Sequence, residues 1–108
     1  YGKNENFDIF YNAPVIVIIS GNMNAYKPEV DCSAAIQNML IASESLNIGS
    51  CWIGLTERLF YGENGKKYNK LFNIPDNYQM FYCISLGYKK FDKAPNPPVK
   101  KDNCVNYV

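Results

Sequence analysis

The chain has 108 residues, of which 47% are hydrophobic and 19% charged, so it can bury the core of one compact domain and lacks the composition typical of disorder. Its formal net charge of +1 gives no overall field that would favour nucleic acid or an anionic membrane surface. The longest apolar run, residues 13–19, contains a proline and is too short to span a bilayer, and the polar first residues lack a signal-peptide core. We therefore expect a cytoplasmic protein that binds neither nucleic acid nor membrane.

The predicted elements begin with the β-branched run at residues 15–19, which is apolar on both faces and predicts a strand in the centre of a sheet. Residues 20–28 contain glycine, asparagine and proline and predict a loop. From residue 30 to 46, apolar residues recur at helical spacing over more than one face, which predicts a long, largely buried helix. Either Asp31 or Ser33 could cap its start.

The next elements are shorter. The apolar segment 50–54 predicts a buried strand or an extended turn that ends at a glycine. Two short helices are expected at residues 56–60 and 66–72, on either side of a glycine-containing turn. Residues 79–86 predict the last clear strand.

The segment after this strand differs in composition. Residues 89–101 hold five lysines and three prolines and predict an extended, solvated arm, whereas residues 104–108 return to strand character. Because an apolar strand at the end of an arm must be buried somewhere, we expect residues 89–108 to contact a partner subunit. Residues 1–108 would form a single domain of the α+β or α/β class with a mixed sheet.

The four cysteines are Cys32, Cys51, Cys83 and Cys104, and none forms a C-x-x-C pair. The chain has no histidine, so we expect no metal site. Each cysteine lies in an apolar sequence context, which favours reduced, buried thiols over the disulfide framework that an even number also allows.

Six short segments of the chain are informative when taken in order. They are Asn-Ala-Pro at 12–14, Asp-Cys-Ser-Ala-Ala-Ile-Gln-Asn-Met-Leu at 31–40, Leu-Asn-Ile-Gly-Ser-Cys-Trp-Ile-Gly at 46–54, Ile-Pro at 74–75, Ile-Ser-Leu-Gly-Tyr at 84–88 and Pro-Pro-Val-Lys-Lys at 97–101. Each is weak alone, but together they cover nearly the whole chain and resemble the C-terminal half of a protein of the nitroreductase family. The resemblance implies an α+β fold: part of a nitroreductase-like α/β sandwich with a central mixed sheet, a long buried helix and an extended C-terminal arm.

The resemblance also implies a function. Such proteins are FMN-dependent oxidoreductases that use NAD(P)H to reduce nitro compounds, quinones or related small-molecule acceptors, and they form intertwined homodimers with flavins at the subunit interface. By this resemblance, backbone groups of Ile53 and Gly54 would bind the N5 and O4 edge of the flavin, and Lys100 and Lys101 would meet its phosphate. Trp52 belongs to the same cofactor-binding segment, with core packing as its other interpretation. No catalytic side chain is expected.

The residues agree with this chemistry in part. A flavin needs backbone donors, an apolar surface and a cation, and the sequence offers all three, whereas a chain without histidine is a poor hydrolase. However, the family's Arg-Ser-x-Arg and Pro-Ser-x-x-Asn-x-Gln-Pro segments do not occur, lysine stands where arginine is common at the phosphate, and Leu55 stands where a second glycine is frequent. We therefore expect a homodimer or pairing with a missing N-terminal half. The alternative is a non-catalytic dimerising fragment without a complete flavin site, and the dehalogenating and flavin-degrading branches of the family also stay open.

Overall fold

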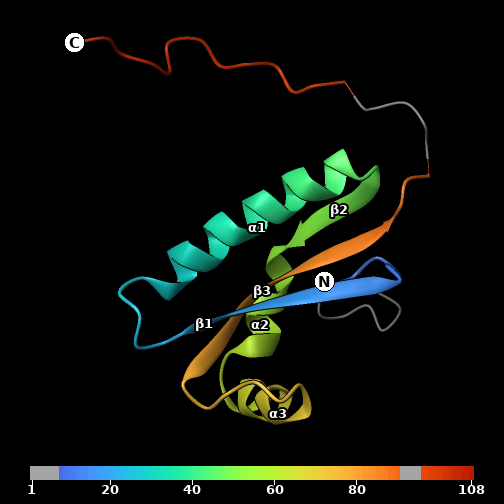
Figure 1. The fold of residues 1–108 in the computed structure, drawn as a ribbon, viewed down its shortest axis with the longest axis vertical. Coiled ribbons are helices and arrows are strands. Elements are labelled where there is room, and N and C mark those ends of the chain that lie inside the picture. The colour runs from blue at the N-terminus through green and yellow to red at the C-terminus, as the bar shows by residue number, and fades with distance from the viewer. Residues whose placement is uncertain (1–7, 91–95) are drawn as a thin grey trace.

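The computed structural model describes residues 8–90 and 96–108 and shows a three-stranded sheet between two layers of helix (Figure 1). The α+β class expected from the sequence is confirmed. The elements in chain order are β1 (Val15–Asn22), α1 (Pro28–Ser45), β2 (Ile48–Ile53), the 3-10 helix η1 (Gly54–Thr56), α2 (Glu57–Phe60), α3 (Glu63–Leu71) and β3 (Tyr78–Tyr88).

The strands lie in the order β1-β3-β2, and both pairs are antiparallel. The expected central position of residues 15–19 is therefore wrong for the described sheet, since β1 lies at its edge and β3 at its centre. The expected mixed sheet does not appear among these three strands. The run in β1 is apolar on both faces because both faces are covered: Val17 and Ile19 pack toward α1, whereas Ile16 and Ile18 pack toward α2 and α3.

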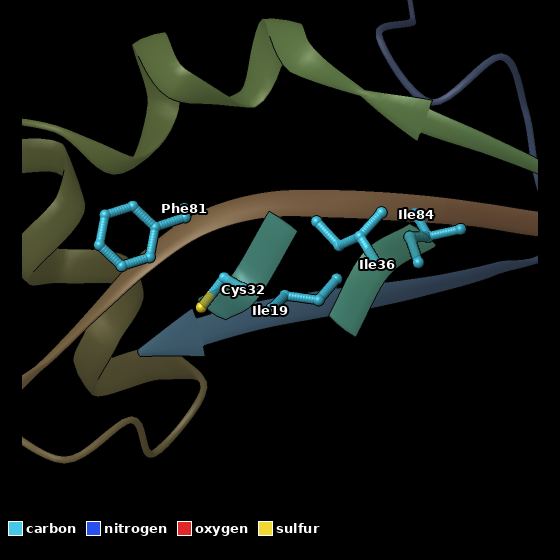
Figure 2. Close-up of a cluster of buried hydrophobic side chains, with 5 residues drawn as sticks. All are labelled: Ile19, Cys32, Ile36, Phe81 and Ile84. Atoms are coloured by element: carbon cyan, nitrogen blue, oxygen red, sulfur yellow. The ribbon is translucent and has the colours of Figure 1, made fainter. Parts of the chain in front are cut away.

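The face of the sheet toward α1 carries the first core cluster, in which Cys32 and Ile36 of α1 meet Ile19, Phe81 and Ile84 (Figure 2). Ile36 is completely buried. Burying an isoleucine side chain contributes about 1.5–3 kcal/mol. Leu40 of α1 also packs against this cluster, which holds the helix on the sheet.

The start of α1 differs from the predicted cap. The helix begins at Pro28, a residue whose fixed φ suits the first turn, and no side chain caps it. Glu29 and Asp31 both lie in the first turn, where their charge interacts favourably with the helix dipole. Ser33 is already inside the helix, and its Oγ donates a hydrogen bond of 2.8 Å to the Glu29 carbonyl.

The expectation of a largely buried helix holds for only one side of α1. Ile41 is 60% exposed and Leu46 is 70% exposed, and Val30 and Met39 are exposed as well. A helix that is apolar on more than one face needs two partners to cover it, and the described sheet supplies one of them.

The opposite face of the sheet is covered by α2 and α3. Its second core cluster consists of Ile53, Phe60, Met80 and Cys83, packed against Leu59 and Tyr68 of the two helices, among others. The two short helices are confirmed with shifted bounds. Gly65 in α3 is buried against the backbone carbonyl of Phe60, so the two helices are in direct contact.

The C-terminal arm leaves the end of β3 and runs outside α1 (Figure 1). Residues 96–108 are exposed and contain no helix or strand, so the strand expected at 104–108 is wrong. A strand needs a neighbour to satisfy its backbone groups, and none of the described segments pairs with it. Before the arm, Lys89 Nζ donates to both carboxylate oxygens of Glu44 at 2.8 Å. Residues 91–95 of the predicted arm lie outside the described residues.

The four cysteines are all free, but they are not all buried. Cys32 and Cys83 lie in the two core clusters, whereas Cys51 and Cys104 are exposed, contrary to the expectation. Cys51 is exposed because it lies on the edge strand β2. Burial raises the pKa of the Cys83 thiol to about 11, and burial also raises the pKa of Cys32.

We expect Cys32 and Cys83 to resist alkylation in the native protein. The thiolate is the nucleophile, and both thiols are buried with raised pKa values, so little thiolate is present at pH 8. The protein is labelled with iodoacetamide in buffer and in about 8 M urea, and the modified cysteines are identified by mass spectrometry. In urea all four cysteines should be modified, whereas in buffer only the exposed Cys51 and Cys104 should be. Equal labelling rates of Cys83 in the two conditions would contradict its burial.

Across the part of the chain that the structure describes, no helix is both long and apolar enough to cross a membrane.

Candidate flavin-binding segment

The predicted segment lies where β2 ends and the chain turns into η1. Ile53 is 3% exposed, belongs to the second core cluster and pairs with Cys83 across the sheet. Its carbonyl accepts a hydrogen bond of 2.9 Å from the Thr56 hydroxyl, which is fully buried, and the N–H of Glu57 donates to the Gly54 carbonyl. These two bonds use the carbonyls of Ile53 and Gly54 for the turn itself and fix its backbone.

Gly54 is exposed, and a Cβ placed on it would meet no atom within 4 Å. Its backbone conformation does not require glycine, because among the described glycines only Gly62 has a positive φ. The surface above Gly54 is therefore open to close approach by a planar group. This is the observation that fits a flavin edge at the end of β2.

Trp52 precedes these residues and is half-buried. Its ring packs edge-on against Tyr82, with centroids 5.2 Å apart and an interplanar angle of 71°, and it belongs to the margin of the first core cluster. These contacts agree with the core-packing interpretation, and the uncovered part of the ring leaves an apolar surface beside Gly54. Its role in cofactor binding stays a prediction.

Lys100 and Lys101 are exposed and lie in the C-terminal arm. The arm runs outside α1, whereas the end of β2 lies near the centre of the fold beside α2 (Figure 1). The structure therefore does not bring these lysines to Gly54 within one chain, and their contact with a phosphate stays a prediction.

The two larger pockets lie elsewhere. One of about 450 Å³ is formed by the end of β1 and the start of α1, and includes Asp31 and Cys32. The other, of about 560 Å³, lies between residues 10–14 and the facing parts of β2 and β3. Neither is lined by Trp52, Ile53 or Gly54. The candidate segment is thus an open edge in the described chain and not an enclosed cavity.

A polar contact beside this segment was not predicted from the sequence. The Tyr82 hydroxyl donates a hydrogen bond of 2.6 Å to Glu29 Oε1. This bond, together with burial and the nearby negative charge, raises the pKa of Tyr82 to about 12. Burial and the charges of Glu29 and Glu57 also raise the pKa of Tyr61. No sequence signal marks these residues, because they come from separate elements that only the fold brings together.

The model of the nitroreductase family matches residues 2–88. An Archaeoglobus fulgidus protein with the provisional name NADH dehydrogenase/NAD(P)H nitroreductase is 36% identical over 85 residues, covering 76% of this chain and 47% of the relative.

Two solved structures share the fold. A nitroreductase with bound FMN from Bacteroides fragilis is 30% identical with a TM-score of 0.85, covering 99% of this chain and 57% of that one. A second nitroreductase with bound FMN, from Desulfitobacterium hafniense, is 27% identical with a TM-score of 0.77, covering 93% of this chain and 53% of that one. The chain spans about half the length of these proteins, so the observed fold corresponds to part of theirs. On the match over residues 2–88, this chain belongs to the nitroreductase family.

Proposed function

We propose that this chain supplies part of an FMN site in an oxidoreductase that takes electrons from NAD(P)H and passes them to small-molecule acceptors such as nitro compounds or quinones. The observation that carries the proposal is the open, exposed Gly54 at a turn whose backbone Thr56 holds. Family membership and the FMN bound in two solved relatives support it.

The residues fit the cofactor at its ring edge. Amide groups of Ile53 and Gly54 would hold the N5 and O4 edge, where backbone dipoles stabilise developing negative charge. The uncovered side of Trp52 would add apolar contact. FMN, when bound, supplies the two-electron redox chemistry, so the chain needs no acid–base side chain of its own at this place.

A partner completes the proposed site. In its own chain the arm runs outside α1 and not beside the end of β2, and its apolar side chains, among them Tyr107 at 92% exposed, are not covered by the described residues. We propose that the arm instead lies against a second copy or against an N-terminal half of the fold, where Lys100 and Lys101 reach the FMN phosphate. The exposed face of α1, with Val30 and Ile41, offers apolar surface for such an assembly.

The direct test uses the full-length protein purified with FMN in the buffer. We expect a yellow protein whose flavin absorbance is lost on anaerobic addition of NADH or NADPH and returns when a quinone or nitro compound is added. A colourless protein with no measurable affinity for FMN would contradict the proposal.

The phosphate contact gives a sharper prediction. Replacing Lys100 and Lys101 together by alanine should weaken FMN binding about tenfold, because an interaction with a charged group is lost. Riboflavin, which lacks the phosphate, should bind the variant as well as it binds the natural protein. The matched control is the replacement of Lys66 and Lys67, two exposed lysines of α3, which should change neither affinity. Equal losses for FMN and riboflavin would contradict a phosphate role.

A second candidate function is a dimerising domain without flavin. It is favoured by the open character of the candidate segment, which lines neither of the two larger pockets. Size measurement in the absence and presence of FMN separates the two: a stable dimer that binds no flavin would support this second candidate.

A further inference from the structure

Tyr82 lies directly beside the candidate segment. The pairing of β2 with β3 runs from Ile48 opposite Tyr88 to Ile53 opposite Cys83, and Tyr82 is the residue of β3 next to this last pair. The Tyr82 ring also packs edge-on against Trp52 at 5.2 Å. The Tyr82 side chain therefore contacts β2 just before the turn.

The hydroxyl of Tyr82 ties this place to a third element. It donates a 2.6 Å hydrogen bond to Glu29 in the first turn of α1. Because the pKa of Tyr82 is raised to about 12, the hydroxyl stays protonated and remains a donor throughout the neutral range. The end of β2, the middle of β3 and the start of α1 are thus held together through one tyrosine.

The contacts of Tyr82 stabilise the end of β2. In the described sheet β2 is an edge strand and pairs with β3 on one side only. Edge strands and their ends open locally more readily than central strands, because fewer contacts hold them. The carbonyls of Ile53 and Gly54 are held by the turn, but its position relative to the sheet depends on contacts such as the one between Trp52 and Tyr82.

We propose that Tyr82, held by Glu29, is a positioning residue that keeps the backbone of Ile53 and Gly54 in the geometry that binds the flavin edge. This inference rests on the proposed function, since it assigns a role toward that cofactor. Tyr82 acts through the backbone of β2 and is not a catalytic residue. Its hydroxyl and the Glu29 carboxylate work as one unit.

The test uses the variants Tyr82→Phe, Glu29→Ala and their combination in the full-length protein, since alanine leaves no acceptor for the Tyr82 hydroxyl. Each single variant should weaken FMN binding about five- to tenfold, as expected for the loss of a hydrogen bond to a charged group, and should shift the flavin midpoint potential. The combination should cost no more than one single change, because the two groups share one interaction. Hydrogen exchange of residues 51–56 without FMN should be several-fold faster in Tyr82→Phe.

Two control variants match these changes. Tyr78→Phe removes the hydroxyl of the first residue of β3. This hydroxyl has no hydrogen-bond partner among the described residues. Glu63→Ala removes an exposed carboxylate from the first turn of α3, a position equivalent to that of Glu29 in α1. Both should leave FMN affinity, midpoint potential and exchange unchanged.

The outcomes separate the two proposals. If the natural protein binds FMN and Tyr82→Phe matches Tyr78→Phe in affinity, potential and exchange, the positioning role is overturned while the proposed function stands. If the natural protein binds no FMN, the proposed function and the role toward flavin both fail. Faster hydrogen exchange in Tyr82→Phe would then show that the hydrogen bond between Tyr82 and Glu29 stabilises the fold alone.

Discussion

The variant Gly65→Ala is expected to lose about 3 kcal/mol or more of its free energy of unfolding, as overpacking against rigid backbone does at the upper end of its range. A Cβ at this position would overlap the carbonyl oxygen of Phe60 and lie 2.8 Å from its carbonyl carbon. A backbone carbonyl at the end of α2 cannot rotate away as a side chain could. The variant must therefore separate α2 from α3 or unfold part of this layer.

The measurement is urea unfolding followed by circular dichroism. Asn64→Ala is the matched control, because Asn64 is the exposed neighbour in the same helix and its replacement should change stability by about 0.5 kcal/mol or less. An unfolding midpoint for Gly65→Ala equal to that of Asn64→Ala would show that the two helices are not in the described contact.

The variant Gly54→Ala should keep the stability of the natural protein and lose affinity for FMN. The added methyl group meets no atom within 4 Å, so stability should be nearly unchanged. The same methyl group occupies the open surface on which the proposed flavin edge lies, and would push it away from the backbone donors. The loss of one or two such hydrogen bonds weakens FMN binding about 10- to 100-fold.

Gly62→Ala is the control for this experiment. Gly62 also has open space around it, but its φ of 78° is unfavourable for alanine. We expect a loss of about 1 kcal/mol in stability and no change in FMN affinity. Isothermal titration with FMN and thermal unfolding of both variants give the comparison. If Gly54→Ala binds FMN as tightly as the natural protein does, the ring edge does not lie at Gly54.

The sequence determined the local elements of this protein well. Helical spacing of apolar residues located α1, and β-branched and apolar runs located all three strands, because these patterns depend on which side chains an element must bury. The order of six short motifs along the chain also led to the correct family. Gly54 as the end of a strand was predictable from composition alone.

Only the tertiary structure decided which elements are neighbours. The run in β1 showed that both its faces are buried, yet burial comes from helices above and below and says nothing about the order of strands within the sheet. For the same reason Cys51 looked buried from its apolar sequence neighbours but is exposed on an edge strand. The placement of Tyr82 against Trp52 and within hydrogen-bond distance of Glu29 depends on the strand register and on the packing of α1. Contacts between residues 53 positions apart arise from the whole fold, and local periodicity carries no information about them.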